Sequence, residues 1–474
     1  MNRVEYAFLS CHSLSTHANV LLVRDALGRP KQCPYGDAIR ATLSPQTQRR
    51  ADRTHMRDQA NLGIGPLASH AWGLRTREWA LSTAESLNSA HDWNHQRALD
   101  TARAALNGLG LNFGTTANTA YLTKVMVFAP ENAGQALAKI INDHQEELDT
   151  WIAAADTAKA AADAVKVKAK KKLKGKTEAD PGDDEEAPAA EAKAKADVPP
   201  MPSKIKKKLI AALAPADAID IALYGRFLTE IATGGNVDGA IQTITAIGIE
   251  PINITEDYFS AADDRKIARQ RQGTDFTSAL ALLNAVDPTL SSDAEDDLPL
   301  GDNRGAGMTG YQPFVSATFY AHSVLDRNLL RRNLRNSGTP EAEIEPAARA
   351  AEQAFLDAFV YAVPSAKKNT SAAPGTLPKL VLVHEGKRAY NYAACFEEAV
   401  QPAAGAPSIQ GAKRLLRHHA MITRKEGISP GAVLTYDLAI SEYIDDLRLT
   451  GELGPIEVHS PEELAAPFTA MQPA

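Results

Sequence analysis

The chain has 474 residues, is 44% hydrophobic and carries a formal net charge of −7, which predicts about three globular domains of roughly 150 residues each. No stretch approaches the roughly 18 uncharged apolar residues of a membrane helix and the first residues lack a secretory pattern, so we expect a soluble cytoplasmic protein. The negative total does not exclude nucleic-acid binding, because residues 1–60 hold nine Lys and Arg against five Asp and Glu, whereas residues 287–303 hold six acidic residues and no base.

The first predicted elements are a strand and a helix. Val4, Tyr6 and Phe8 alternate with other residues in a period of two, which is typical of a strand. After a loop rich in Gly and Pro, Ser44 is placed to cap a helix and Pro45 fits its first turn. We expect this helix to extend through the arginine-rich sequence that follows.

Four more elements complete the pattern. Alternating apolar residues at 219–223 predict a second strand, and β-branched and aromatic residues at 313–325 predict a third. Apolar residues recur at helical spacing over 348–362, ahead of a fourth strand at 379–383. The order β-α-β-β-α-β predicts an α+β, ferredoxin-like (RNA-recognition-motif-like) fold.

Two insertions interrupt this pattern and are far longer than ordinary loops. The expected division of the chain is a core domain in three parts with a helical and a smaller insertion between them: residues 1–60, 216–230 and 313–474 for the core, 61–215 for the helical insertion and 231–312 for the smaller one. A segment at about 155–208 is rich in Lys, Ala and Glu and almost devoid of large apolar residues. We expect this segment to be disordered.

A row of arginines makes the first helix a candidate for contacts with phosphates. Arg49, Arg53 and Arg57 lie at i, i+4 and i+8 and share one helix face, with Arg50 beside them. Charge runs more often form a solvated face. The preceding loop favours binding, because it adds cations beside a sheet edge where this fold class meets RNA: Arg24, Arg29, Lys31 and Arg40.

Tyr258 and Phe259 are adjacent aromatic residues flanked by acidic ones in the smaller insertion. One hypothesis is that they stack on or wedge between bases, where each stacked base is worth roughly 1–3 kcal/mol. The alternative is that one of them anchors the insertion to a small core of its own.

Metal and thiol sites are disfavoured by the spacing of the ligand residues. The three cysteines form no CxxC pair, and Cys11, His12 and His17 match no tetrahedral metal pattern. His418 and His419 are neighbours on a predicted basic helix and would point apart. We therefore expect no metal and no cofactor.

Two acidic residues leave an enzymatic alternative open. Asp25 and Asp37 lie in the basic loop region, where carboxylates bind magnesium in some RNA-cleaving sites. A turn or a salt bridge to Arg24 or Arg40 is the favoured interpretation. The Gly-rich run at Gly305–Gly310 lacks the GK[ST] ending of a phosphate loop.

Several blocks of the sequence resemble the CasC-type backbone subunit (RAMP superfamily) of the type I-E CRISPR Cascade complex. RDALGRPK at Arg24–Lys31 resembles the family's RDDxGxPK, IDIALYGRF at Ile219–Phe227 its DIALxGRM, DYFSAADD at Asp257–Asp264 its DWFTAVDD, and VPSAKKNTSA at Val363–Ala372 its VPGAKQNTxA. Together with shorter blocks they keep the family's order from residue 4 to about 415.

This resemblance implies a hand-like RNA-binding protein that is not an enzyme. The core domain would be a palm, the large insertion the fingers and the smaller one a thumb. Copies would stack head to tail along one CRISPR guide RNA with other Cascade subunits, while the thumb of a neighbour flips out nucleotides at intervals. Target DNA would then be read by pairing with the guide.

The resemblance also implies which residues contact the guide, with Phe227 in place of the family's wedge methionine and Tyr258–Phe259 in place of its Trp-Phe. The candidate RNA-binding residues are Arg24, Lys31, Arg40, Gln46, Arg49, Arg50, Arg53, Arg226, Phe227, Tyr258, Phe259, Lys367 and Lys368.

Two other functions remain as alternatives. One is a metal-dependent ribonuclease, because backbone subunits of related type III complexes cleave target RNA with an Asp in a comparable loop, here Asp25 or Asp37. The other is a free-standing single-strand RNA-binding protein outside any CRISPR system.

Overall fold

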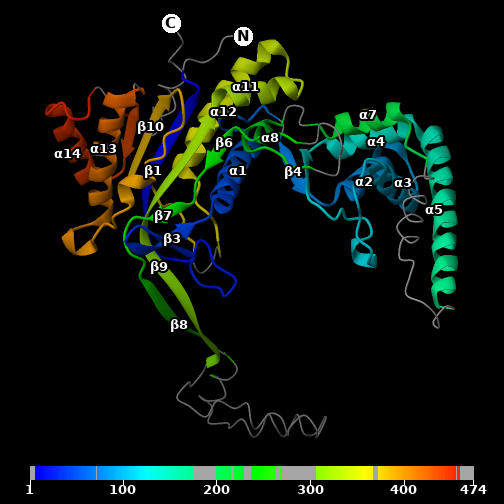
Figure 1. Ribbon diagram of the computed structural model, residues 1–474, viewed down its shortest axis with the longest axis horizontal. Helices are drawn as coiled ribbons and strands as arrows, with labels where there is room; N and C mark the ends of the chain where they lie inside the picture. The colour runs from blue at the N-terminus through cyan, green and yellow to red at the C-terminus, as the bar shows by residue number, and fades with distance from the viewer. Residues whose placement is uncertain are drawn as a thin grey trace, which may run out of the picture.

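The computed structural model describes residues 6–70, 72–174, 199–214, 218–228, 236–262, 264, 267, 306–366, 372–426, 428–454 and 456–459. It has a mixed α+β fold built on a ten-stranded sheet (Figure 1). None of the helices in these ranges has the length and apolar character to span a bilayer.

The centre of the sheet is strand β1 (Phe8–Val20), which pairs antiparallel with β9 (Ala306–Asp326) on one side and β10 (Leu380–Gly386) on the other. Beyond β10 lie β11 (Ala432–Thr435) and the short β12 (Glu457–Val458). On the other side, β9 pairs with β6 (Ile241–Thr243) and β7 (Ala246–Gly248), and β7 leads to β3 (Ala38–Leu43) and β2 (Gln32–Tyr35).

Successive side chains of β1 point to opposite faces of the sheet. Leu9 and Cys11 belong to a core shared with α1 (Pro45–Asn61), α8 (Ile219–Tyr224), α11 (Arg327–Asn336) and α12 (Glu341–Tyr361). Leu14 belongs to a core shared with η3 (Ala393–Phe396), α13 (Pro407–Glu426) and α14 (Leu438–Leu449), and η4 (Pro402–Ala404) lies just before α13. Helices therefore cover both faces, as Figure 1 shows.

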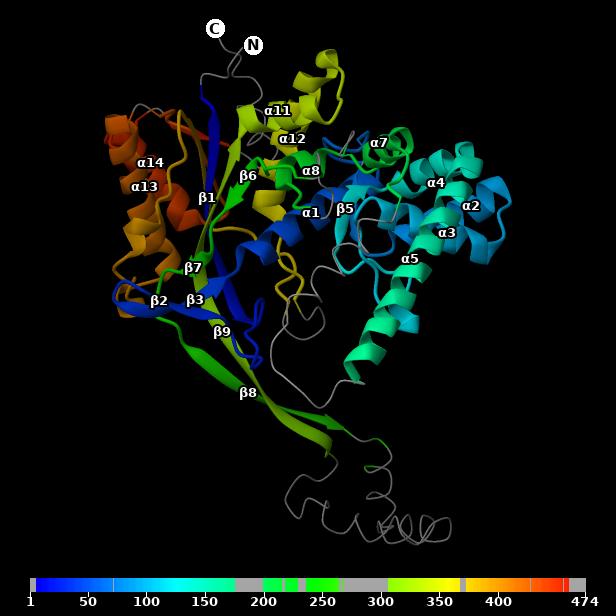
Figure 2. The same cartoon turned by 45° about the vertical axis from the view of Figure 1, so that its right-hand side comes forward.

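The larger insertion is mostly helical in its described residues and has its own core. It contains α2 (Trp79–His91), α3 (His95–Gly108), η1 (Ala117–Thr119), α4 (Ala133–Asp143), α5 (Gln145–Lys174), α7 (Ser203–Ala212) and a two-stranded sheet of β4 (Gly73–Thr76) and β5 (Val127–Pro130). Trp79, Leu106 and Leu137 are fully or almost fully buried in this core. Figure 2 shows it on the side of the molecule away from α13 and α14.

The smaller insertion contributes β8 (Ile254–Ala262), which pairs antiparallel with the first half of β9. The residues of β8 are exposed apart from Ile254, so the two strands form a ribbon that extends from the sheet (Figures 1 and 2). We call this ribbon the arm.

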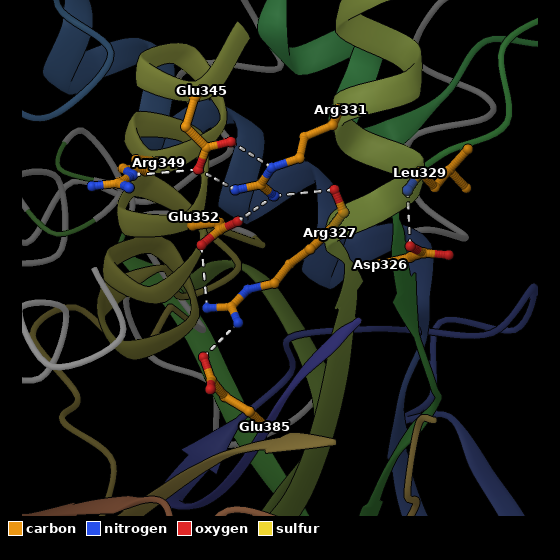
Figure 3. Close-up of polar contacts among 8 residues, drawn as sticks. All are labelled: Asp326, Arg327, Leu329, Arg331, Glu345, Arg349, Glu352 and Glu385. Carbon is orange, nitrogen blue, oxygen red and sulfur yellow. Dashed lines mark hydrogen bonds and ion pairs between the residues drawn. The ribbon is translucent and has the colours of Figure 1, made fainter. Parts of the chain in front are cut away.

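A buried charge network fastens α11 and α12 to the sheet (Figure 3). Arg327 is 4% exposed and forms ion pairs with Glu352 on α12, at 3.2 Å, and with Glu385 on β10. Arg331, one turn later, reaches Glu352 and Glu345 at 2.9 and 2.7 Å. Buried charges are tolerated when they are paired in this way.

Four predicted elements are confirmed in the structure: the first helix is α1, with Ser44 at its N-cap and Pro45 in its first turn, the second is α12, and the strands at 313–325 and 379–383 lie in β9 and β10. Ser44 makes no side-chain cap; its hydroxyl shares a hydrogen bond of 2.9 Å with that of Thr47.

The second predicted strand is wrong, because residues 219–224 form helix α8. All six residues are buried, so the alternation of large apolar residues did not mark an exposed and a buried face. β6, at Ile241–Thr243, pairs with β9 instead.

Two other expectations change at their boundaries. The first strand begins at Phe8, and residues 1–5 lie outside the described part of the chain. The segment 155–208 is helical at both ends, where α5 continues to Lys174 and α7 begins at Ser203, so disorder is wrong there; residues 175–198 are not described.

Candidate nucleic-acid interface

The basic loop between β1 and β2 presents three cations to solvent. Arg24, Arg29 and Lys31 are exposed, and none makes a side-chain hydrogen bond or ion pair with another described residue. Asp25 shapes the loop, because its Oδ1 accepts the backbone N–H groups of Leu27 and Arg29 at 2.8 and 2.9 Å. The favoured prediction, a turn residue, is confirmed for Asp25.

The basic loop lies next to the start of α1. The backbone N–H of Thr42 donates to the carbonyl of Lys31 at 2.9 Å, two residues before the N-cap Ser44. Gln46 and Arg50, on the first two turns of α1, are exposed. Together with the free backbone N–H groups of a helix N-terminus, these side chains form a surface suited to anions. We call Arg24, Arg29, Lys31, Gln46 and Arg50 the basic edge.

The predicted arginine row lies on one face of α1, but that face packs against the insertion. Arg49 donates to the carbonyl of Tyr224 at 2.7 Å, and Arg57 donates to the carbonyl of Gly73. Arg53 donates to Asp220 at 3.3 Å and lies 4.4 Å from the centre of the Phe128 ring. These guanidinium groups join α1 to α8 and to the β4–β5 sheet, which corrects the picture of a row aimed at solvent.

Arg40, a predicted RNA contact, is not part of the basic edge, because its side chain is fully buried. Its Nη1 donates to the carbonyl of Ile249 at 2.8 Å, and its Nη2 to Oδ1 of Asp37 at 3.0 Å. Asp37 also accepts the N–H of Ala399 at 2.8 Å, and this bond is the largest cause of its lowered pKa. The salt bridge favoured for Asp37 is confirmed.

Arg226 is also buried, at 7% exposure, and donates to the backbone carbonyls of Phe128 and Leu213. Burial lowers the pKa of its guanidinium to about 10. Arg226, a predicted RNA contact, is therefore not part of the basic edge. The next residue, Phe227, is 79% exposed, so the anchored Arg226 holds an aromatic ring in solvent.

Tyr258 and Phe259 lie on opposite faces of the arm. Tyr258 is directly across from Tyr311 on β9, with ring centres 5.3 Å apart. Phe259 is across from Gly310, where a Cβ would approach the Phe259 ring to 2.7 Å. Tyr258, Tyr311 and Phe259 are 48, 72 and 40% exposed. Neither predicted aromatic is part of a core formed by the residues that the structure describes, and Tyr311 is an aromatic that the sequence reasoning missed.

The remaining predicted sites do not add to this surface. Lys367 and Lys368 lie outside the described residues. Met308 and Gly310, from the Gly-rich run, are part of β9, so the described part of that run is a strand and no phosphate loop. Cys11 and His12 point to opposite faces of the sheet and share no metal site. In the described ranges, no three His, Cys, Asp or Glu residues are grouped as metal ligands.

A stack of aromatic rings lies on the face of the sheet that α13 covers. In an RNA-recognition module, the sheet has an open face on which bases stack. The His12 ring lies 4.5 Å from His322, 5.2 Å from His384 and 4.2 Å from Tyr392, measured between centroids. His419, on α13, shares a hydrogen bond with Tyr392 at 3.1 Å. Helix α13 closes this face of the sheet, so the exposed aromatic rings described above lie on the arm and at Phe227. The sequence reasoning missed the stack.

Comparison with known proteins places this geometry in context. A family model described as CT1975-like protein matches residues 9–286 and 293–436. A chain of a structure described as "CRISPR RNA-guided surveillance complex, pre-nicking" is 22% identical with a TM-score of 0.65, over 98% of this chain and 99% of that one. A chain of a "CRISPR RNA-guided surveillance complex" is 19% identical with a TM-score of 0.59, over 98% and 100%. No curated protein matches the chain.

Proposed function

Since the chain belongs to the CT1975-like protein family, we propose that it is a guide-RNA-binding backbone subunit of a Cascade-like CRISPR surveillance complex, of the type I-E kind. Copies bind head to tail along one guide in the cytoplasm, beside other subunits, and leave the guide's bases free to pair with target DNA. The similarity in fold to chains of CRISPR RNA-guided surveillance complexes, over nearly the whole length of both chains, supports this proposal.

The basic edge is the observation that carries the proposal. Four cations and an amide are exposed around the start of α1, although the chain as a whole is acidic. Cations without carboxylate partners favour the binding of phosphates, because no carboxylate of the protein competes with the phosphate for the cation. The guide's sugar-phosphate backbone follows this edge.

The arm supplies the second contact. Its exposed rings lie on both faces of a two-stranded ribbon, and aromatic rings stack on bases without regard to sequence. We infer that the arm of one copy inserts between nucleotides held by the next copy and acts as the thumb. Phe227 is the palm's wedge beside a base.

The palm is a ferredoxin-like unit in this proposal. The strands β10, β1, β9 and β6 lie side by side in that order. Along the chain, α1 lies between β1 and β6, and α12 lies between β9 and β10. This arrangement supports the β-α-β-β-α-β order, with β6 as its second strand.

We also propose that the subunit binds RNA without cleaving it. Asp25 and Asp37, the carboxylates of the ribonuclease alternative, both hold the local backbone through N–H groups and, for Asp37, through Arg40. An assay with guide-complementary RNA and magnesium, on the wild type and on Asp25→Ala, tests this. Product that depends on Asp25 would overturn it.

The direct test of the function is to purify the tagged chain from its native host and sequence the bound RNA. Recovery of short CRISPR-derived guides is expected, and their loss in an Arg24→Gln, Arg29→Gln, Lys31→Gln variant would place them at the basic edge. Arg388→Gln is the matched control. Arg388 is an exposed cation that pairs with Glu426, and it lies far in sequence from the basic edge. Unrelated RNA would instead indicate a free-standing binder.

A further inference from the structure

The helical insertion contains an open pocket of about 490 Å³ that the proposed function does not use. It lies between α3 and the loop that follows this helix. Its lining offers cations, amides and hydroxyls, and none of its lining residues is acidic. The polar lining residues are Arg103, Asn107, Asn112, Thr115, Thr116 and Lys124.

Backbone bonds hold the two sides of the loop in a fixed relation. The N–H of Lys124 donates to the carbonyl of Asn112 at 2.7 Å, and the N–H of Gly114 donates to that of Leu122 at 3.1 Å. A Cβ on Gly114 would meet the Thr119 hydroxyl at 2.2 Å, so only glycine fits there. Asn107 donates to the carbonyl of Leu111 at 3.2 Å, which ties α3 to the start of the loop. The pocket is therefore built into the fold.

The two cations of the pocket have no acidic partner. Arg103 and Lys124 are exposed, and neither forms an ion pair with another residue in the described part of the chain. The guanidinium carbon of Arg103 lies 5.9 Å from the centres of both the Phe113 and the Tyr121 rings, which restricts where the group can point. Two neighbouring cations without counter-charges repel one another until an anion binds between them.

We propose that this pocket binds a phosphate group. A phosphate monoester carries a charge of about −1.5 to −2 at pH 7 and three acceptor oxygens, which suits a planar guanidinium, an ammonium and nearby hydroxyl and amide donors. The volume falls within the roughly 300–1,000 Å³ of small-ligand pockets and exceeds what a bare phosphate needs. The phosphate is therefore part of a larger ligand, either a free nucleotide or a nucleic-acid strand.

This inference does not depend on the proposed function, because the pocket lies on the surface of the helical insertion and shares no residue with the basic edge. The test uses the full-length chain and three probes: inorganic phosphate, uridine monophosphate, and a fluorescent 20-nucleotide oligo(dT). Binding of the first two is measured by calorimetry and of the third by anisotropy over a range of salt concentrations. The variants are Arg103→Gln and Lys124→Gln, and Lys139→Gln, an exposed cation on α4 outside the pocket, is the matched control.

Each pocket variant is expected to weaken phosphate-dependent binding about tenfold, while Lys139→Gln changes it less than twofold. If uridine monophosphate loses affinity but oligo(dT) does not, the ligand is a free nucleotide. If oligo(dT) loses affinity and its salt slope falls by about one in each variant, the ligand is a strand. Wild-type affinities for all three probes in both pocket variants would overturn the proposal, and circular dichroism of each variant would show that the fold is intact.

Discussion

Asp220 on α8 accepts a hydrogen bond from Arg53 on α1 at 3.3 Å and another from the N–H of Gly73 on β4 at 2.7 Å. Asp220 is 1% exposed, so one buried carboxylate joins two parts of the core domain that are distant in sequence, α1 and α8, to the insertion. Desolvation raises the pKa of this carboxyl, and Arg53 and the Gly73 N–H oppose that shift. The hydrogen bonds from Arg53 and from the N–H of Gly73 replace those that water would make to the carboxylate of Asp220.

Asp220→Ala is expected to lower the free energy of unfolding by about 3 kcal/mol, because it leaves the half-buried guanidinium of Arg53 and the backbone N–H of Gly73 without their partner. Urea denaturation measures this. Arg97→Ala is the control, since the Arg97–Asp149 pair is nearly half exposed on both sides and is expected to cost less than about 1 kcal/mol. Equal losses in the two variants would contradict the assignment of Asp220 as a junction.

The basic edge and the half-buried arginines of α1 are expected to respond differently to substitution. Replacing Arg24, Arg29 and Lys31 by Gln lowers the salt slope of single-strand RNA binding by about two, because three phosphate contacts are lost. Arg53→Gln lowers stability at an unchanged slope. The measurement is RNA affinity against salt concentration, and a larger change of slope in Arg53→Gln would reverse the assignment.

The arm is expected to control nucleotide geometry more than stability. Tyr258→Ala removes one ring of the cross-strand pair with Tyr311, which costs about 0.5–1.5 kcal/mol. Footprinting of the assembled complex with Tyr258→Ala, Phe259→Ala is expected to lose its periodic pattern of protected nucleotides. The double variant in which Glu256 and Asp257 become Gln and Asn is the control. A periodic footprint without the two rings would show that the arm does not intrude between bases.

Stability is expected to fall in mild acid because of the buried stack. Burial lowers the pKa of His322 and His419 from an ordinary value of 6.5 to about 4, and it also holds the pKa of His12 and His384 well below 6.5. Between pH 6.5 and 4 the unfolded chain binds protons that the folded chain does not. Each such histidine removes about 1.4 kcal/mol of stability per pH unit in this window.

Unfolding free energies measured from pH 7.5 to 5.0 check this prediction. His384→Phe is expected to make the decrease shallower, because one buried titrating group is gone, while His95→Gln, at an exposed position, leaves it unchanged. A pH-independent stability over this range would mean that the histidines are not kept neutral by the fold.

The sequence predicted the elements whose side chains have one clear periodicity. α12 and β10 are long and apolar enough for their spacing to be read directly, and both were found. α8 was misread because Asp220 and Tyr224, the polar-looking positions of the pattern, are buried by contacts with α1 and β4 that are distant in sequence.

The residues of the candidate site could be predicted from the sequence only where the solvent exposure of their side chains could be predicted. Arg24 and Lys31 sit in a turn that a local motif defines, and they are exposed as the motif suggests. Arg40 has the same local context, but it points inward to carbonyls at Gly248, Ile249 and Phe396. The local pair with Asp37 could be predicted from the sequence, but the three carbonyl partners could not, because they lie more than 200 residues away.

β9 is one unbroken strand of 21 residues whose last residues pair with β1 and β6 and whose first residues form the arm. At roughly 3.3 Å per residue it spans about 70 Å. No loop separates the arm from the sheet, so the arm's direction is set by the twist of the central strands. In the proposed assembly, the distance that the arm of one copy can reach toward the next is fixed by the number of β9 residues that precede Val315.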